Sequence, residues 1–309
     1  MNDGSTSELS ACPEAARPVL ARYLAGEISA EVAIMQLLLA VGGMAPLIDC
    51  LTAIAATAPD EPAVGVLQQV MIEHPAALAG AVALVESGLA RERAGNIAAI
   101  RQQFDDAVAI APEAAVALYS LGSPATLDRA TAELVSRLDE WGLLGPDIIA
   151  LDIGCGIGRL ETALASRLRA ITGVDLSPGM IEEARRRCAG LVNVDVAVCD
   201  GTGLAAFAGR DYDLILAVDA FPYLVAADSA LAERHVADAA RLLPAGGALV
   251  ILNCSYRGDL DADRNAVADL ASRYGFTVLR NGTRDFTLWD GATFLLCKEE
   301  RLSARRRRE

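Results

Sequence analysis

The stretch that decides the fold of this chain is LDIGCGIGRL, residues 151–160. An apolar run typical of a buried strand leads into it, and leucines at helical spacing follow it. Its glycines allow a tight turn and let a ligand approach the backbone closely. Beyond the turn, the first residues of a helix present free N–H groups. The stretch therefore predicts a strand, a ligand-binding turn and a helix.

Strand-like and helix-like runs alternate from Gly145 onward. Strands are expected at residues 147–153, 171–176, 194–199, 212–218, 248–254, 276–279 and 293–297. Helices are expected from residue 160 to about 168 and at residues 178–188, 228–243 and 261–274. This alternation is typical of a doubly wound α/β fold, in which helices cover both faces of a mostly parallel sheet. Ligands bind such sheets beyond the carboxyl ends of the strands.

Residues 1 to 145 are predicted to be entirely helical. Ser29 is expected to cap a helix that runs through Leu38. Further helices are expected from residue 46 towards 58, at residues 60–74, and in a longer run after residue 76 that weakens at Gly88. Ser123 and Pro124 form the start signal of a last helix. That helix carries an apolar stripe of Leu127, Ala130, Leu134 and Leu138 and ends at Gly142.

The charge balance narrows the possible partners. Of 309 residues, 41 are acidic and 27 basic, a formal net charge of −14. A nucleic-acid-binding protein usually presents a basic face, so this charge argues against such a partner. The longest apolar stretch, residues 37–48, is interrupted by glycine and proline and is too short to span a membrane. The N-terminus lacks the features of a signal peptide. We therefore expect a cytoplasmic protein that does not enter a membrane.

Carboxylates stand at the ends of two further predicted strands. Asp175 lies 21 residues after Gly154, where nucleotide-binding folds place an acid that accepts hydrogen bonds from ribose. Asp200 and Gly201 follow the next strand, where a carboxylate can accept a hydrogen bond from an adenine amino group. Each acid could instead be a turn or helix-cap residue. The glycine spacing is Gly-x-Gly-x-Gly rather than the Gly-x-Gly-x-x-Gly of dinucleotide sites, which argues against a nicotinamide cofactor.

Residues 145–298 resemble the class I S-adenosylmethionine-dependent methyltransferases. Residues 152–158, 173–177 and 199–201 resemble that family's first three motifs, residues 213–219 its fourth strand, and residues 243–247 the turn before its fifth strand. Leu243 or its neighbour stands where the family usually has lysine. The resemblance implies seven strands with the last antiparallel, and S-adenosylmethionine (SAM) as cofactor. The first 110 residues resemble no known family.

The resemblance also implies roles for individual residues. Those implied to bind the cofactor are Asp152, Gly154, Cys155, Gly156 and Gly158 around the methionine part, Asp175 at the ribose, Leu176 and Met180 on the adenine, Asp200 and Gly201 at its edge, and Asp219 near the sulfonium. Tyr119 is a further candidate, because relatives often carry a lid residue there that touches the methionine carboxylate. The seven cysteines contain no CxxC pair, and we predict no metal site.

The sequence offers few side chains that could act as a general base, and this bears on which atom of the acceptor is methylated. Histidine is the usual general base, but His74 precedes a proline and His235 is expected on a helix surface. This favours a small soluble acceptor that reacts at sulfur or nitrogen, such as a thioether or an amino-acid-like molecule like methionine. Asp219 or Tyr223 could serve an oxygen acceptor. Tyr223, Tyr256, Arg257 and Trp289 are predicted to line the acceptor pocket, although each aromatic could simply pack in the core.

The predicted domain organisation has four parts. Residues 1–110 form a helical region that covers the site or mediates homodimerisation, residues 111–145 a helical lid or linker, residues 146–300 the SAM-binding methyltransferase domain, and residues 301–309 a disordered basic tail. Three alternatives stay open: an O-methyltransferase, a non-catalytic sensor or scaffold that binds SAM or S-adenosylhomocysteine (SAH), and an NAD-dependent oxidoreductase.

Overall fold

The computed structural model describes residues 12–57, 62–73, 75–90 and 95–299. Contacts divide the chain into two compact units. The helical unit comprises Met1–Glu92, Gln103–Ala132 and Phe286–Asp290, and the α/β unit comprises Arg93–Gln102, Glu133–Asp285 and Gly291–Glu309. This division does not coincide with the boundaries expected after residues 110 and 145. The expected basic tail lies outside the described residues.

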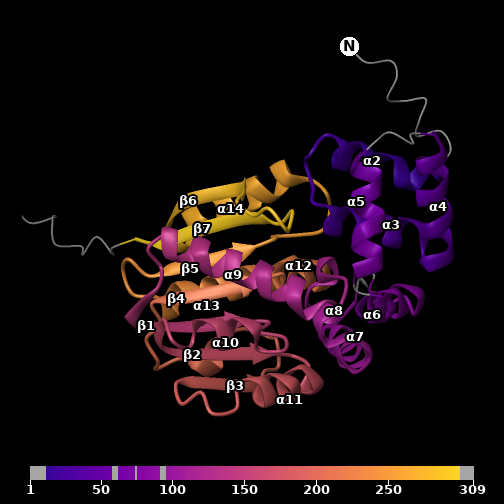
Figure 1. Cartoon of the computed structure of the whole chain (residues 1–309). Coiled ribbons are helices and arrows are strands. Elements are labelled where there is room, and N and C mark those ends of the chain that lie inside the picture. Colours follow the sequence, from indigo (N-terminus) through magenta and orange to yellow (C-terminus); the bar gives the residue numbers. More distant parts are fainter. Residues whose placement is uncertain (1–11, 58–61, 74, 91–94, 300–309) are drawn as a thin grey trace, which may run out of the picture. The chain divides into compact units, whose positions relative to one another are not determined.

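In the described residues, the α/β unit holds a sheet of seven strands in the order β3-β2-β1-β4-β5-β7-β6 (Figure 1). The strands are β1 Gly145–Ile153, β2 Leu168–Asp175, β3 Val194–Val198, β4 Leu214–Val218, β5 Ala248–Leu252, β6 Phe276–Arg284 and β7 Ala292–Lys298. Strands β1 to β5 pair in parallel, and β7 lies antiparallel between β5 and β6. The predicted fold class is therefore confirmed, including the antiparallel last strand.

The helices of the α/β unit follow the strands closely. They are α10 Arg159–Leu164, α11 Pro178–Arg187, α12 Phe221–Ala227, α13 Ser229–Leu242 and α14 Leu260–Tyr274, with the short η4 Ala205–Phe207. Ser177 caps α11, and its hydroxyl accepts a hydrogen bond from Met180 N at 3.0 Å. Helix α12 was not predicted. The chain turns sharply after β4 at Asp219 (φ 58°), and Pro222 fits the first turn of the new helix.

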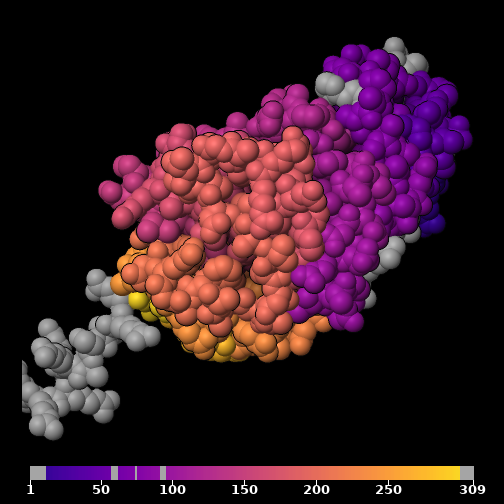
Figure 2. Space-filling view, turned by 90° about the horizontal axis from the view of Figure 1, so that it is seen from below, coloured from indigo at the N-terminus to yellow at the C-terminus, as the bar shows by residue number. Residues whose placement is uncertain are grey.

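The core of the α/β unit is centred on β4 and β5, which are buried at every residue. Such continuous burial requires both faces of the sheet to be covered. Large side chains that fill this core include Leu151, Ile215, Phe221 and Phe294. The covered sheet thus positions the strand ends at which a ligand would bind. Figure 2 shows the α/β unit from below the view of Figure 1, so that the residues of β3 and α11 face the reader.

The helical unit is built from short helices. They are α2 Arg17–Leu24, α3 Ala30–Val41, α4 Met44–Thr57, α5 Pro62–Glu73, α6 Pro75–Glu86, α7 Ile97–Ile110, α8 Pro112–Val116 and α9 Pro124–Glu140, with the 3₁₀ turns η2 Glu14–Ala16 and η3 Leu118–Ser120. Helices α7 and α9 each contribute residues to both units. Caps at Ser29 and Ser123 are confirmed, since their hydroxyls accept from Val32 N and Thr126 N.

One helix prediction in this region is wrong. The long run expected after residue 76 ends at Glu86, where Ser87 and the left-handed Gly88 (φ 78°) begin a turn. No single helix in the described ranges is long and apolar enough to cross a membrane. Helices α3 and α4 pass that test only as a pair, and the chain bends by 117° between them.

Candidate functional site

The glycine turn after β1 has the predicted conformation. Gly154, Gly156 and Gly158 have φ of 73°, 55° and 78°, in the left-handed region that favours glycine. A Cβ on Gly154 would lie 2.7 Å from the Cβ of Ala220, and one on Gly158 would lie 3.1 Å from the Cβ of Ala184. The turn therefore needs glycine for its own packing as well as for the approach of a ligand.

Asp175 ties this turn to the end of β2. Its carboxylate accepts hydrogen bonds from Gly156 N at 3.0 Å and from Ser177 N at 2.9 Å. The acid expected at the ribose is thus also a turn residue, and the two interpretations are compatible. The hydrogen bonds orient the carboxylate at the carboxyl end of the strand, next to the glycine turn.

The end of β3 carries the next predicted group. The exposed Asp200 accepts hydrogen bonds from Thr202 N at 2.8 Å and Thr202 Oγ1 at 2.9 Å, and these bonds lower the pKa of Asp200. Gly201 (φ 69°) leaves room for Leu176 Cδ2, which occupies the space a Cβ would need. Leu176 and Gly201, predicted to meet the adenine, are therefore in direct contact.

A polar cluster joins the ends of β4 and β5. Asn253 Nδ2 and Tyr256 Oη both donate to Asp219 Oδ1, at 2.7 and 2.8 Å. Asp219 and Asn253 have left-handed backbones, which is uncommon for residues other than glycine and concentrates at functional sites. Tyr223 packs edge-on against Tyr256, with ring centroids 5.9 Å apart. Three predicted residues, Asp219, Tyr223 and Tyr256, are thus brought together, and Asn253 was missed.

Asp152 lies beneath the glycine turn in a buried acid pair. Asp152 and Glu161 are 2% and 0% exposed. Asp152 Oδ1 and both oxygens of Glu161 find no hydrogen-bond donor in the described residues. Burial raises the pKa of Asp152 to about 7 and raises the pKa of Glu161 well above its ordinary value. Burial of two neighbouring carboxyl groups therefore disfavours their both being ionised at once.

The sequence analysis missed Glu161, although a signal was present. Gly173 lies inside β2, where glycine weakens a strand unless another group must approach closely. A Cβ on Gly173 would collide with Glu161 Oε1 and would lie 2.9 Å from the Cβ of Cys155. The glycine in the strand therefore makes room for the buried carboxyl group.

Arg257, predicted to line the acceptor pocket, pairs with a carboxylate of its own unit. Its Nε donates to Asp263 Oδ1 at 2.8 Å, and Ser255 Oγ donates to the same oxygen. The Asp263 side chain is 7% exposed and that of Arg257 is 43% exposed. The guanidinium thus pairs with a buried carboxylate at the start of α14, while part of the Arg257 side chain stays exposed.

Tyr119 and Trp289 belong to the helical unit. They are 4% and 7% exposed and stack with ring centroids 5.9 Å apart. Phe286 adds a third ring, 5.4 Å from that of Trp289. The two residues expected at the lid and at the acceptor pocket therefore meet each other. Core packing, the alternative kept open for the aromatics, agrees with the burial of Trp289.

The expectation that His235 lies on a helix surface is wrong. The side chain is 2% exposed, and Nδ1 lies 2.9 Å from Leu231 O. Residues 231, 235, 239 and 242 fall on the buried stripe of α13, so helical periodicity carries the histidine inward. Burial lowers the pKa of His235, which keeps the ring neutral. His74 lies outside the described residues.

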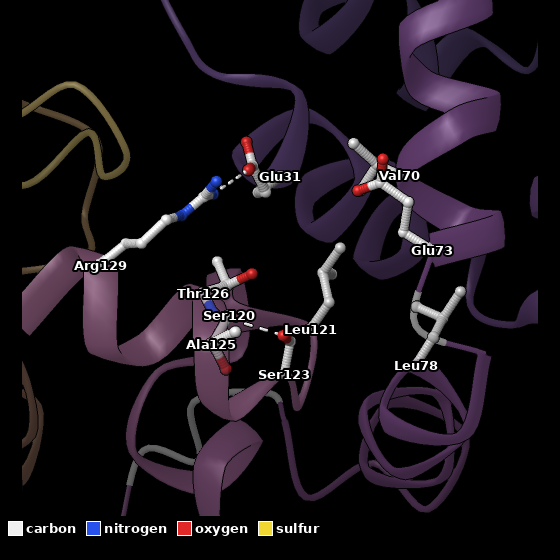
Figure 3. A pocket seen from close by; sticks show the side chains of 10 residues that line it. All are labelled: Glu31, Val70, Glu73, Leu78, Ser120, Leu121, Ser123, Ala125, Thr126 and Arg129. Atoms are coloured by element: carbon white, nitrogen blue, oxygen red, sulfur yellow. Dashed lines mark hydrogen bonds and ion pairs between the residues drawn. The ribbon is translucent and has the colours of Figure 1, made fainter.

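The helical unit contains a cavity of about 90 Å³ (Figure 3). Across it, Arg129 Nη2 and Glu31 Oε1 form an ion pair of 2.8 Å. Leu121, in a left-handed conformation (φ 54°), and the buried Ser120 and Ser123 also line it. Hydroxyls, apolar side chains and charges of both signs therefore line this space. The sequence analysis assigned none of these residues to a site.

The site geometry and the topology together define a class. A glycine turn after β1 with carboxylates after β2 and β3 is the arrangement of a nucleotide-binding α/β fold. The seven-strand order with an antiparallel β7 between β5 and β6 is the arrangement that the resemblance to class I methyltransferases implied.

Comparison with known proteins agrees with this class. Residues 150–247 match the family described as "Methyltransferase domain". The demethylmenaquinone methyltransferase of Tropheryma whipplei (strain Twist) is 32% identical over 106 residues, 34% of this chain and 41% of that protein. The aklanonic acid methyltransferase DauC of Streptomyces sp. (strain C5) is 33% identical over 112 residues, 35% of this chain and 48% of that protein. This chain thus spans less than half the length of either relative.

A solved structure shows the same fold. Phosphoethanolamine N-methyltransferase 1 of Haemonchus contortus, in complex with phosphoethanolamine and S-adenosylhomocysteine, superposes with a TM-score of 0.50 at 15% identity. The match covers 67% of this chain and 50% of that chain. Residues 150–247 thus carry a methyltransferase domain, within an α/β unit that has the strand order of the class I methyltransferase fold.

Proposed function

We propose that this protein transfers a methyl group from SAM to a small soluble acceptor, at sulfur or nitrogen. The observation that carries the proposal is the meeting of two features at the carboxyl ends of the adjacent central strands β1 and β4. The glycine turn after β1 packs against Ala220, and Ala220 directly follows Asp219 of the polar cluster. A methyl donor held by the turn would present its sulfonium towards that cluster.

The cofactor is proposed to lie along the carboxyl ends of β1, β2 and β3. Asp175 and Asp200 are oriented by backbone hydrogen bonds at the positions proposed for ribose and adenine. Leu176 and the buried Met180 would cover the base. The sulfonium supplies a methyl carbon that is already electrophilic, so the residues of this chain align the acceptor and exclude water.

The acceptor atom is proposed from the bases present at the strand ends. The described histidine, His235, is buried in α13 and bonded to its own helix. Asp219 accepts hydrogen bonds from Asn253 and Tyr256, and its carboxylate could also accept one from an acceptor ammonium or hydroxyl. A thioether or a neutral amine attacks through its own lone pair, whereas an ammonium must first lose a proton to the solvent. An amino-acid-like acceptor such as methionine fits this chemistry.

Two other functions remain as competing proposals. An O-methyltransferase would use Asp219 or Tyr223 as the base for a hydroxyl acceptor. A sensor or scaffold would bind SAM or SAH without turnover. The NAD-dependent oxidoreductase is not retained, because residues 150–247 match a methyltransferase family and the third glycine follows the second after a single residue.

Binding and turnover separate these proposals. Titration calorimetry with SAM, SAH and NAD should show binding of the first two and none of NAD. A metabolite pool incubated with methyl-labelled SAM and the enzyme should then yield a labelled product whose new bond identifies the acceptor atom. Absence of SAM binding would refute the site. Tight SAM binding with no labelled product from complete cell extracts would favour the sensor.

Assembly and location form a separate part of the proposal. Ile48, Val66 and Ile72 expose 48%, 49% and 69% of their surface on the helical unit, which is compatible with homodimerisation there. The roles expected for Tyr119 and Trp289 from the sequence stay predictions. A cytoplasmic location is likewise kept. Light scattering of the purified protein tests the dimer, since a monomeric mass at 100 µM or so would exclude a dimer of even moderate affinity.

A further inference from the structure

Helix α7 begins beside the proposed adenine position. Although the helix precedes the methyltransferase motif by some 50 residues, Arg93–Gln102 belongs to the α/β unit. Ile97 packs against the core of that unit. Asn96 starts the helix, and its Oδ1 accepts a hydrogen bond from Ala99 N at 3.0 Å. The first turns of α7 are therefore anchored at a defined place on the α/β unit.

Two contacts fix that place. Arg101 Nε donates to the carbonyl oxygen of Leu176 at 2.8 Å. The Cβ position of Gly201 lies 3.5 Å from Ile97 Cγ2 and in contact with Leu176 Cδ2. Leu176 and Gly201 are the residues proposed to meet the face and edge of adenine. Ile97 and Arg101, which lie outside the family motifs, thus contact the residues proposed to bind adenine.

The space next to this turn is not filled by protein. An open cavity of about 430 Å³ adjoins it, with Thr202 of the β3 loop on one side and the start of α7 on the other. Its lining comprises Asn96, Ile97, Ala98, Thr202, Leu231 and Arg234, together with the junction of α12 and α13. Ile97 therefore borders both this cavity and the contact between Leu176 and Gly201.

We infer that the first two turns of α7 form one wall of the adenine pocket. This inference rests on the proposed function and adds residues of the N-terminal region to the cofactor site. Ile97 offers an apolar side chain to the base. Arg101 offers a planar guanidinium, which can stack on an aromatic face. The same helix continues to Ile110 in the helical unit, so binding of the base stabilises a helix that both units share.

The test is calorimetric binding of SAH and of adenosine to the full-length chain. Ile97→Ala should weaken both ligands by about tenfold, because a hydrophobic wall loses several carbon contacts. Arg101→Ala should weaken both by about three- to tenfold. The loss should be equal for the two ligands, since they share only the adenosine part. If a variant weakened binding only because the whole protein was less stable, its melting temperature would fall as well. Melting temperatures of these variants and of the controls distinguish the two cases.

Matched controls are available in the same protein. Ile110→Ala makes the same change at the far end of α7, where the side chain is 44% exposed. Arg167→Ala removes a guanidinium that pairs with Asp139 on the protein surface. Both should bind SAH as the wild type does. As an independent readout, saturating SAH should slow amide hydrogen exchange at residues 98–102.

Each outcome has a distinct meaning. If the wild type binds neither ligand, the proposed function fails and this inference fails with it. If the wild type binds SAH but Ile97→Ala and Arg101→Ala bind it with unchanged affinity, only the role of α7 is refuted. Unchanged exchange at residues 98–102 in the SAH complex would refute it as well.

Discussion

Asn253 donates a hydrogen bond from Nδ2 to Asp219 Oδ1 at 2.7 Å, and both residues have left-handed backbones, with φ of 63° and 58°. They end neighbouring strands, and sheet hydrogen bonds hold them there: Asp219 N donates to Leu252 O and Asn253 N to Ala292 O. A left-handed residue other than glycine costs roughly 1–3 kcal/mol. The surrounding sheet thus imposes strain on two polar residues that follow the carboxyl ends of β4 and β5, next to the proposed reaction site.

Replacing Asn253 tests this arrangement. Asn253→Ala removes the hydrogen bonds to Asp219 and Ala292 while keeping a Cβ in a strained conformation, so it should lower the free energy of unfolding by about 2–3 kcal/mol. Asn253→Gly removes the same bonds but relieves the strain, and should be about 1 kcal/mol more stable than the alanine variant. Urea unfolding measures both. Equal stabilities would show that the backbone at this position is not strained.

Tyr256→Phe isolates the hydroxyl that reaches Asp219. The ring and its edge contact with Tyr223 stay, so the affinity for SAM should be unchanged. Loss of one hydrogen bond to the carboxylate should lower kcat about tenfold. Tyr274→Phe is the control, because that hydroxyl donates to Glu233 in an exposed ion-pair cluster. Label transfer from SAM gives kcat. If Tyr256→Phe turns over as fast as Tyr274→Phe, the polar cluster is not part of the reaction site.

Asp175→Ala should weaken the binding of SAM by about ten- to a hundredfold. The carboxylate would lose charge-assisted hydrogen bonds to ribose, and the turn would lose the acceptor for Gly156 N and Ser177 N. Asp195→Ala, on the exposed side of β3, should bind SAM normally.

Gly156→Arg should abolish the binding of SAM, since arginine does not fit the left-handed turn. Calorimetry with SAM decides, and wild-type affinity in Asp175→Ala would contradict the ribose assignment.

The buried acid pair predicts a pH dependence of stability. Burial raises the pKa of Asp152 to about 7 and also raises that of Glu161, so between about pH 4 and 7 the folded state holds more protons than the unfolded chain. Stability contributed by these groups is therefore present at low pH and is lost as the pH rises, by at most about 1.4 kcal/mol per pH unit for one proton. Thermal unfolding from pH 5 to 8 measures the slope.

Glu161→Gln should flatten this slope and raise the melting temperature at pH 8, because an uncharged amide replaces the carboxyl group beside Asp152. Glu183→Gln is an informative counterpart, since Arg186 and Arg187 lower the pKa of Glu183. The Glu183 carboxylate contributes stability at neutral pH that is lost under acid. Glu183→Gln should therefore lower the melting temperature at pH 8, whereas Glu161→Gln should raise it. An unchanged slope in Glu161→Gln would mean that the pair is not the source.

Arg257→Ala distinguishes an internal role from substrate binding. Removal of the guanidinium leaves Asp263 buried with only Ser255 as a side-chain donor, so we expect a loss of about 1–3 kcal/mol in the free energy of unfolding. Arg167→Ala, whose partner Asp139 has a side chain that is 54% exposed, should change stability much less. A variant of Arg257 that keeps wild-type stability but raises KM for the acceptor would restore the role expected from the sequence.

Much of the fold was accessible from the sequence because its signals are local. The alternation of strands and helices, the caps at Ser29, Ser123 and Ser177, and the glycine turn each depend on residues within a few positions of one another. Helix α12 escaped prediction because it is short and its start depends on the turn that Asp219 makes after β4. The burial of His235 was not predicted, because helical periodicity shows which residues of α13 share a face but not which face packs against the core.

By itself, the sequence determined the class of this protein: a doubly wound sheet, a glycine turn, and carboxylates after the second and third strands. Only the tertiary structure decided which distant side chains meet. Asn253 and Tyr256 reach Asp219 because β4 and β5 are adjacent in the sheet, Glu161 lies beside Asp152 because Gly173 leaves it space, and Arg101 reaches Leu176 across 75 residues of chain. The physical reason is that spacing along a chain specifies backbone conformation, whereas proximity across a sheet is created by packing the whole core.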